Sequence, residues 1–310
     1  MLPGTDQRVL TPKFEALELD KSVPSWWSRH LDNFKPDSAA LLSERLANFS
    51  LSATSLNSFT DVTRGGPQQF FLDSILKFPS VQAPSAEYGS ALHMTLDWCF
   101  KQTRTSAGKA PKLDAVLKEF EQILNKRYLN KSDFNHYLVQ GKESLKAYLS
   151  QVDQTIGLDD LSEQSQSVTL GVNNDIRLNG KIDRLIINKS KREIKIIDFK
   201  SGSSYERWNN SDAKSFHHQR QLYFYKLLVE QSSKFKGYKV SSASLQFVEP
   251  DEQGVIKNLE LIFNEEAEQS LLELISAVWS KIMNLDFPDT SNYKNNISGI
   301  KAFEAEILGK

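Results

Sequence analysis

The chain contains few of the residues and segments on which several classes of protein depend. It has one cysteine in 310 residues, which excludes a disulfide framework, a cysteine-based zinc site and a four-cysteine iron–sulfur cluster. It has no apolar run near the ~18 residues that a membrane span needs, and its N-terminus has no apolar signal-peptide core. We therefore expect a cytoplasmic protein without membrane contact.

An excess of charge of one sign is also absent. Lys and Arg number 38, and Asp and Glu number 39, so the formal net charge is −1. This excludes a globally basic surface for nucleic acid, and any binding of a polyanion has to use a local patch. The G-x-x-x-x-G-K-[ST] pattern of a P-loop ATPase is missing as well. The composition is that of an ordinary globular protein, with 39% hydrophobic and 25% charged residues, and the length suits one large domain or two modest ones.

The first half of the chain is predicted to be mainly helical. Prolines interrupt residues 1–50, where we expect a helix only near 37–48. The main body begins at about residue 51, with Thr54 or Ser55 as a helix N-cap. Apolar residues at helical spacing predict further helices at 87–103, 112–130 and 133–153.

From about residue 166 the sequence alternates with the period of a strand. The alternation predicts strands at 167–171, 176–178, 182–187 and 193–200, with a turn at 188–192, and later strands at 240–248 and 255–263. Between and after these strands we expect a polar loop at 203–217 and helices at 219–231 and 265–283. Strands embedded among helices favour one α/β domain.

The strand that ends at Lys200 carries the most informative polar residues. Asp198 and Lys200 share a face with Ile194 and Ile196, and Asp and Lys are seldom fully buried unless they are paired. Taken alone, the pattern indicates an ion pair where the sheet meets solvent. Asp183 in the preceding strand changes this interpretation, because a tight turn between the strands brings both aspartates to the same end or face of the sheet.

Two neighbouring carboxylates suggest a bound cation. They repel each other, and one stays protonated unless a cation joins them. Their oxygen ligands suit Mg²⁺ or Mn²⁺. Beside such an ion, Lys200 would stabilise charge that develops on a phosphate, or help to position and activate water.

Two helical pairs add further candidates. Gly89 and His93 lie one turn apart in the helix predicted at 87–103, and Gln221 and Tyr225 do so in the helix at 219–231. Each pair has an ordinary structural explanation, since a lone helical histidine is usually structural and the second pair suits the polar edge of a packed helix. Beside the aspartates, however, His93 would add an imidazole ligand.

Taken in order, these patterns resemble the motif series of RecB-family nucleases within the PD-(D/E)XK superfamily. The series is Gly-x-x-x-His, Gly-x-x-Asp-Arg, Asp-Phe-Lys-Ser-Gly and Gln-x-x-x-Tyr, over roughly residues 51–288. The resemblance implies an α/β fold with a restriction-endonuclease-like core, in which helices flank a mixed central sheet, and with additional helices. It implies these site residues: His93, Asp183, Asp198 and the Phe199 carbonyl as ligands of Mg²⁺ or Mn²⁺, Lys200 as the catalytic lysine, and Gln221 and Tyr225 as residues that orient the lysine or contact the DNA backbone.

The preceding segment resembles the entry to the nuclease module at the C-terminus of UvrD/AddB-like helicase–nucleases. The matching stretches are Leu51-Ser-Ala-Thr-Ser-Leu-Asn57 and Pro67-Gln-Gln-Phe-Phe71. Many such relatives hold an iron–sulfur cluster with one cysteine just before that proline and three near the C-terminus. Here Gly66 precedes the proline and residues 284–310 contain no cysteine. We therefore expect no iron–sulfur cluster, and a domain end that is secured by packing.

The charge of the candidate site is locally positive. Residues 181–220 hold ten Lys or Arg and five Asp or Glu, as binding to a phosphate backbone requires; a solvated lysine-rich loop is the alternative. Tyr205 and Trp208 would stack on single-stranded bases or simply pack. The candidate DNA contacts are Arg184, Arg207, Lys214 and Arg220.

These expectations combine into a functional prediction. A lead-in at 1–50 precedes a nuclease domain at 51–288, and a tail at 289–310 packs on that domain. The function expected is a metal-dependent DNA nuclease that hydrolyses phosphodiesters in DNA repair and recombination; exonuclease activity is one expectation, and the sequence leaves endonucleolytic cleavage open. Its partners would be single-stranded DNA or duplex ends and a UvrD-like helicase motor in the same or another chain. The alternative is a catalytically silent DNA-binding or helicase-docking scaffold of the same fold.

Overall fold

The computed structural model describes residues 36–152, 159–171 and 175–310. The chain divides into two compact units, Met1–Asn48 and Phe49–Lys310. The described part of the first unit is helix α2 (Pro36–Ala47), close to the helix predicted at 37–48. The irregular start predicted before it lies outside the described residues. The second unit continues to the last residue, so it includes the predicted tail.

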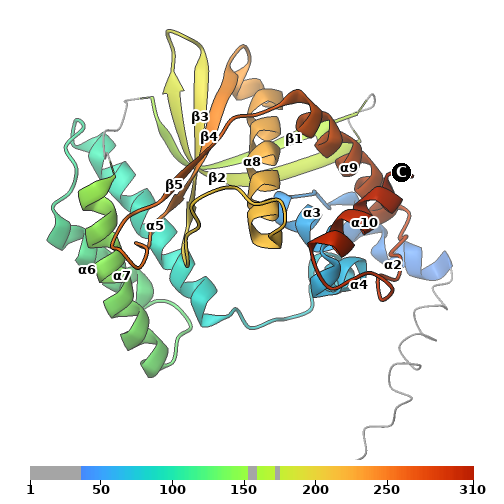
Figure 1. Ribbon diagram of the computed structural model, residues 1–310, viewed down its shortest axis with the longest axis horizontal. Coiled ribbons are helices and arrows are strands. Elements are labelled where there is room, and N and C mark those ends of the chain that lie inside the picture. Colours follow the sequence, from blue (N-terminus) through green and yellow to red (C-terminus); the bar gives the residue numbers. More distant parts are fainter. Residues whose placement is uncertain (1–35, 153–158, 172–174) are drawn as a thin grey trace, which may run out of the picture. The chain divides into compact units, whose positions relative to one another are not determined.

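The second unit consists of helices around one five-stranded sheet (Figure 1). Its helices are α3 (Ala53–Thr60), η1 (Val62–Arg64), α4 (Gly66–Phe70), η2 (Phe71–Leu76), α5 (Pro84–Thr105), α6 (Leu113–Leu124), α7 (Lys131–Gln151), α8 (Ala213–Gln231), η3 (Ser233–Phe235), α9 (Glu265–Met283) and α10 (Ile297–Ile307). Its strands are β1 (Leu161–Leu170), β2 (Ile176–Asn188), β3 (Glu193–Lys200), β4 (Lys239–Phe247) and β5 (Asn258–Leu261).

The sheet is mixed, as the sequence predicted. Its strands lie in the order β1-β2-β3-β4-β5, and β2 is antiparallel to both β1 and β3. Strand β4 is parallel to β3, and β5 is antiparallel to β4. Because parallel neighbours need a long crossover, α8 connects β3 to β4 and lies against the sheet.

Helices cover both faces of the sheet at β3. Ile197 and Phe199 belong to a buried core formed with α5, α6 and α7. The alternate residues Asp198 and Lys200 contact Gln221 of α8 instead. Since successive side chains of a strand point to opposite faces, the layer of α5–α7 and the helix α8 lie on opposite sides of β3 (Figure 1).

Several predicted boundaries were wrong, and polar capping explains two of them. Helix α8 begins inside the predicted loop because the Asp212 side chain accepts a hydrogen bond from the Ser215 N–H at 2.7 Å. The N-cap of α3 is Ser52, which accepts from the Ser55 N–H at 3.0 Å, rather than Thr54 or Ser55.

Strand β5 is shorter than the predicted 255–263 for a related reason. The Val255 N–H donates to the Asp251 carboxylate and the Ile256 N–H to the Gln151 side chain, at 2.9 and 3.0 Å. These two N–H groups are therefore bound outside the ladder, and pairing with β4 covers only Asn258–Leu261.

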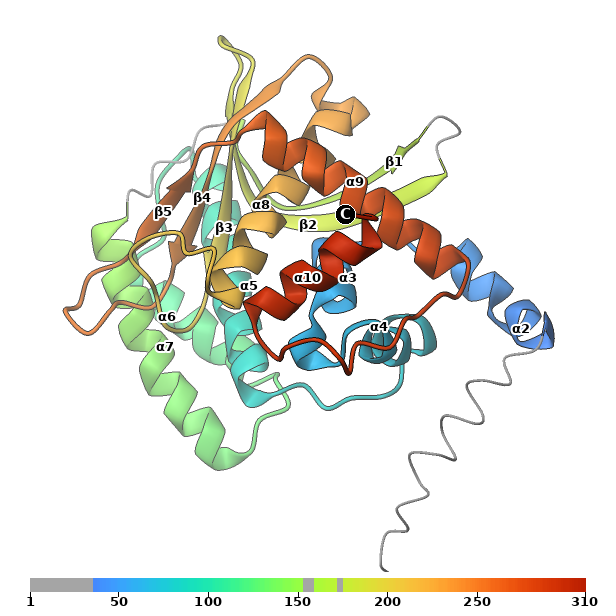
Figure 2. The same cartoon turned by 45° about the vertical axis from the view of Figure 1, so that its right-hand side comes forward.

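The C-terminal segment packs directly on the rest of the second unit. Helix α10 lies beside α3 and α9 (Figure 2), and Phe303 stacks on Phe59 with ring centroids 6.4 Å apart. The Gln68 amide donates to the Pro288 carbonyl at 2.7 Å. A Cβ at Gly66 would lie 3.1 Å from Oγ1 of the buried Thr290. The position that the resemblance linked to an iron–sulfur cysteine is thus in close contact with the C-terminal segment.

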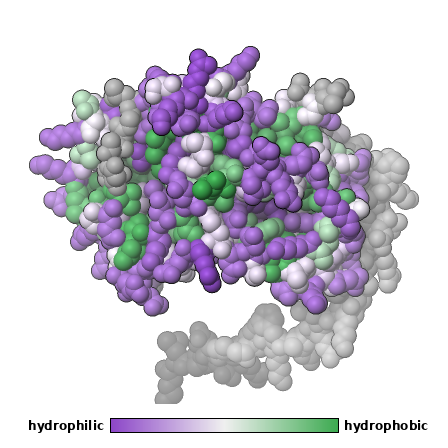
Figure 3. Space-filling model, turned by 45° about the horizontal axis from the view of Figure 1, so that its top comes forward, coloured by the Kyte–Doolittle hydropathy of each residue, from purple (hydrophilic) through white to green (hydrophobic). Residues whose placement is uncertain are grey.

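Hydrophilic residues predominate on the face shown in Figure 3, and apolar residues form small groups among them. The most exposed large apolar side chains, Val81, Tyr128 and Ile262, come from three separate segments. None of the helices in the described part of the chain has the length and apolar content to span a bilayer.

Candidate active site

The two predicted aspartates lie at neighbouring positions on β2 and β3. The antiparallel ladder of these strands ends with Arg184 opposite Ile197, and Asp183 and Asp198 are the next residues beyond this pair. The tight turn after β2 sets the register that brings them to the same level of the sheet.

Asp183 is held by two hydrogen bonds. Its Oδ2 accepts from the Phe199 N–H at 2.7 Å, and its Oδ1 lies 3.1 Å from Nδ1 of His93 on α5. Burial disfavours the charged imidazole, but the charge and hydrogen bond of Asp183 outweigh it, so the pKa of His93 is raised. Helix α5 therefore does place His93 beside Asp183.

Asp198 is almost completely buried, with 2% of its surface exposed. Its Oδ2 lies 2.7 Å from the Lys200 ammonium, and its Oδ1 accepts from the Gln221 amide at 3.3 Å. Burial raises the pKa of Asp198 above its ordinary value, Asp183 adds to the shift, and Lys200 opposes it. The carboxylate thus depends on nearby positive charge to remain ionised.

Gln221 connects three of the candidate side chains. Its Oε1 accepts from Lys200 at 2.8 Å, and its Nε2 donates to the Tyr225 hydroxyl at 2.7 Å as well as to Asp198. Gln221 and Tyr225 lie one turn apart on α8, as their spacing predicted. The Lys200 ammonium is therefore fixed from two sides, by a carboxylate and an amide.

Two glycines of the motifs allow helices to approach the site closely. A Cβ at Gly89 would lie 2.6 Å from Oγ of Ser201, which follows Lys200, and a Cβ at Gly180 would lie 2.6 Å from Leu228 on α8. A Cβ at either position would require the Ser201 hydroxyl or the Leu228 side chain to move. The glycines have a packing role here, which spacing alone did not reveal.

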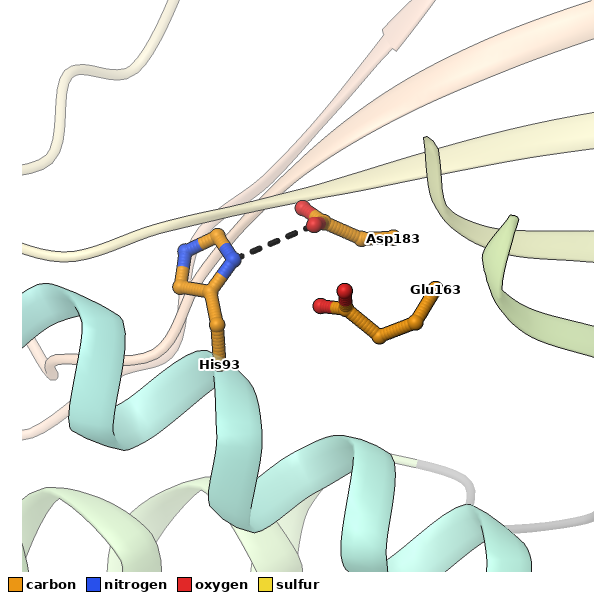
Figure 4. A group of neighbouring side chains, drawn as sticks. All are labelled: His93, Glu163 and Asp183. Atoms are coloured by element: carbon orange, nitrogen blue, oxygen red, sulfur yellow. Dashed lines mark hydrogen bonds and ion pairs between the residues drawn. The ribbon is translucent and has the colours of Figure 1, made fainter. Parts of the chain in front are cut away.

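The structure adds Glu163 to this site. Its neighbours on β1, Ser162 and Gln164, pair with Arg184 and Ile182, so Glu163 lies level with Asp183. One side-chain ligand atom from each of His93, Glu163 and Asp183 lies within 4.8 Å of the others (Figure 4). We missed Glu163 because the strand was predicted to begin at 167, whereas β1 begins at Leu161.

Comparison with known proteins identifies the family. The model of the PD-(D/E)XK nuclease superfamily matches residues 50–295, which include every site residue described above. The chain belongs to the PD-(D/E)XK nuclease superfamily. No curated protein matches it. Among solved structures it is similar to a "Putative exonuclease" from Eubacterium rectale, at 11% identity and a TM-score of 0.45, over 83% of this chain and 87% of that one.

The donors of this PD-(D/E)XK site fit a hard divalent ion. Carboxylate oxygens and an imidazole nitrogen are ligands that Mg²⁺ or Mn²⁺ accepts, and the buried carboxylate of Asp198 next to Asp183 needs positive charge. The structure brings the predicted ligands together in part: Asp198 lies outside the 4.8 Å group of His93, Glu163 and Asp183 and is bound by Lys200. The Phe199 carbonyl stays a predicted ligand.

Two of the four predicted DNA contacts are instead structural. Arg184 is buried, pairs with Asp160 at 3.1 Å and lies over the Phe100 ring. Arg220 is buried and pairs with Glu304. Both guanidinium groups are occupied inside the fold, so we withdraw their prediction as DNA contacts.

The other two predicted contacts lie on the surface. Arg207 is exposed in the segment between β3 and α8. Lys214 is exposed in the first turn of α8, and its ammonium donates to the Ser203 carbonyl at 3.1 Å. Both remain predicted DNA contacts.

The aromatic side chains of the same segment pack rather than project. Tyr205 lies against Phe247 with ring centroids 5.2 Å apart, and its hydroxyl is 2.9 Å from Nδ1 of His218. The Trp208 indole donates to the Glu260 carbonyl at 2.9 Å. Of the two roles considered for Tyr205 and Trp208, these contacts support packing and give no support to base stacking.

Proposed function

We propose that this chain is a Mg²⁺- or Mn²⁺-dependent DNA nuclease that hydrolyses phosphodiester bonds. The observation that carries the proposal is the Lys200 ammonium, held by Asp198 and Gln221 beside the Asp183–His93 pair. Membership of the PD-(D/E)XK superfamily supports it. The order of the four motifs supports a RecB-type role as the nuclease module of a DNA-repair helicase–nuclease, with a UvrD-like motor as partner.

The side chains suggest how a phosphodiester would be hydrolysed. The Lys200 side chain is 19% exposed, so its ammonium is accessible to a phosphate while Asp198 and Gln221 fix its position. Preorganised positive charge of this kind stabilises the charge that develops on the attacked phosphate. Asp183 and Asp198, with His93, would hold the metal ion, which supplies Lewis acidity and lowers the pKa of bound water.

Local charge would position the DNA. The whole chain is nearly neutral, so general electrostatic attraction to DNA is weak. Arg207 and Lys214 are exposed in the segment that follows the catalytic strand. We propose that they contact the phosphate backbone next to Lys200.

The test is digestion of end-labelled DNA by the full chain. Linear and circular substrates, each single- and double-stranded, are incubated with Mg²⁺, Mn²⁺ or EDTA. We expect cleavage with either ion and none with EDTA, and an exonuclease degrades linear substrates while closed circles stay intact. A chain that is inert on every substrate with both ions, also after addition of a UvrD-like helicase, contradicts the proposal and supports the scaffold alternative.

A further inference from the structure

Glu163 stands out among the acidic side chains near the site. It lies on β1, level with Asp183 on β2 and close to His93 on α5 (Figure 4). Asp198 follows Asp183 across the sheet, just beyond the end of the β2–β3 ladder. Three adjacent strands therefore each contribute one carboxylate at the same level of the sheet. Two of these carboxylates, Glu163 and Asp183, lie close to the His93 imidazole.

The surroundings of Glu163 are unusual for a carboxylate with only a structural role. Its side chain is 13% exposed, and its ion pair is with Lys181, whose side chain is 61% exposed. The ion pair is made by the Oε2 atom, which is itself buried. A largely buried carboxylate beside a second carboxylate needs a cation nearby to remain ionised. The Lys181 side chain is exposed enough for its ammonium to move into solvent when another cation takes its place.

We propose that Glu163 is a ligand of the divalent ion, together with Asp183 and His93, and that the Lys181 ammonium balances its charge when the ion is absent. This inference rests on the proposed function, since it extends the donor set of the same site. The chemistry of the group supports it: two carboxylates and an imidazole suit Mn²⁺, and their ligand atoms lie within 4.8 Å of one another.

A purely structural role for Glu163 makes a different prediction. If the Glu163 carboxylate served only to hold Lys181, removing either side chain would change the Mn²⁺ affinity in the same direction. If Glu163 binds the ion, the two changes act in opposite directions, because one removes a ligand and the other removes a competing positive charge.

The experiment is a titration of the full chain with Mn²⁺ in the absence of DNA. Binding is measured by calorimetry and by the electron paramagnetic resonance signal of free Mn²⁺. Glu163→Gln should weaken Mn²⁺ binding about 10–100-fold, the range seen when support of a metal site is lost. Lys181→Met should tighten it on the order of 2–10-fold, because a nearby positive charge is removed. The matched control is Lys189→Met, at an exposed lysine after β2 that pairs with Asp159, which should leave the affinity unchanged.

The outcomes separate this inference from the proposed function. Wild-type affinity in Glu163→Gln, or equal weakening by Glu163→Gln and Lys181→Met, overturns the role of Glu163 even if the wild-type chain cleaves DNA. Failure of the wild-type chain both to bind Mn²⁺ and to cleave DNA overturns the two together. If Glu163→Gln does not fold, which thermal unfolding without metal shows, Lys181→Met decides alone: tighter Mn²⁺ binding supports the role, and unchanged or weaker binding overturns it.

Discussion

Lys200 is bound to a carboxylate and an amide at the same time. Asp198 supplies the charge that an ammonium needs when its side chain is 19% exposed, and Gln221 fixes its direction without adding a second negative charge. Gln221 is in turn held by its hydrogen bond to Tyr225. The positive charge at the end of β3 is therefore preorganised, the property that makes such a group effective against a phosphate.

Two adjacent histidines of α8, His217 and His218, are partly buried. Burial lowers the pKa of His217 to about 4, and nearby Arg220 adds to this shift. Burial also lowers the pKa of His218 to about 3, and Lys200 adds to it. They add little positive charge to the basic segment at neutral pH.

This burial predicts a dependence of stability on pH. In the unfolded chain a histidine takes up its proton near pH 6.5, whereas His218 in the folded chain does so only near pH 3. Stability is therefore full above pH 6.5 and falls as the pH drops towards 3, because the unfolded state binds more protons. His218→Gln should reduce the loss in urea midpoint between pH 7 and pH 5.

The control for this prediction is His136→Gln, since His136 is exposed on α7. It should keep the pH dependence of the wild-type chain. Equal pH dependence in wild type and His218→Gln would contradict this, because it would show that His218 binds its proton over the same pH range in the folded and the unfolded chain.

At the level of single residues, the sequence predicted contacts within short motifs better than contacts between distant segments. Strand alternation and helical spacing suffice to place Asp198 beside Lys200 and Gln221 beside Tyr225. The partners of Arg184 and Arg220 could not be predicted, since Asp160 and Glu304 come from segments whose packing has no local signature. Predicting Glu163 as a site residue would have required the start and register of β1. The mostly polar sequence at 161–166 gave no sign of a strand there.

At the level of elements, the packing of α7 on α6 depends on one glycine. Gly141 of α7 is buried, and a Cβ there would overlap the ring of Phe120, which is fully buried on α6. Alanine would favour the helix over glycine by ~1 kcal/mol, but the overlap requires the ring or the helix to move.

We predict that Gly141→Ala destabilises the chain in spite of its better helix propensity. Overpacking of a core typically costs about 1–3 kcal/mol, and urea unfolding measures it as a lower midpoint. Lys146→Ala, on the exposed side of the same helix, is the control and should change the midpoint little. An increase in stability for Gly141→Ala would show that α6 and α7 separate without cost.

Strong periodicity predicted elements well, and their ends depended on side chains. Apolar spacing predicted α9 with the bounds that the structure gives, 265–283. The errors at α8 and β5 arose where Asp212, Asp251 and Gln151 bind backbone N–H groups. Such side chain–backbone hydrogen bonds compete with helix and strand pairing, and periodicity does not register them.

At the level of the whole second unit, Arg220 joins three segments that are far apart in the sequence. From α8 it binds Thr60 of α3 at 2.9 Å and Asn57 at 3.2 Å, and it pairs with Glu304 of α10. The Arg220 and Glu304 side chains are only 7% and 13% exposed. A buried ion pair thus joins the C-terminal helix α10 to α8, which carries Gln221 and Tyr225 of the active site.

We predict that Arg220→Met destabilises the second unit strongly. Removing one partner of a buried ion pair leaves the other charge uncompensated and costs on the order of 3–5 kcal/mol, measured by urea unfolding. Lys310→Met removes the exposed pair between Lys310 and Glu273 and should change the urea midpoint little, because solvent screens exposed pairs. Similar small effects of both changes would mean that Glu304 is solvated without its partner.

The central claim, a nuclease whose catalytic cation is Lys200, is tested most directly by comparing Lys200→Ala with the wild-type chain on end-labelled DNA with Mn²⁺. The metal ligands stay in place, so the account predicts a cleavage rate lower by on the order of 10²–10³. Affinity for DNA should change little, because one phosphate contact is a small part of the electrostatic total. Cleavage by Lys200→Ala at the wild-type rate, or Mn²⁺-dependent cleavage by neither protein, would contradict the account.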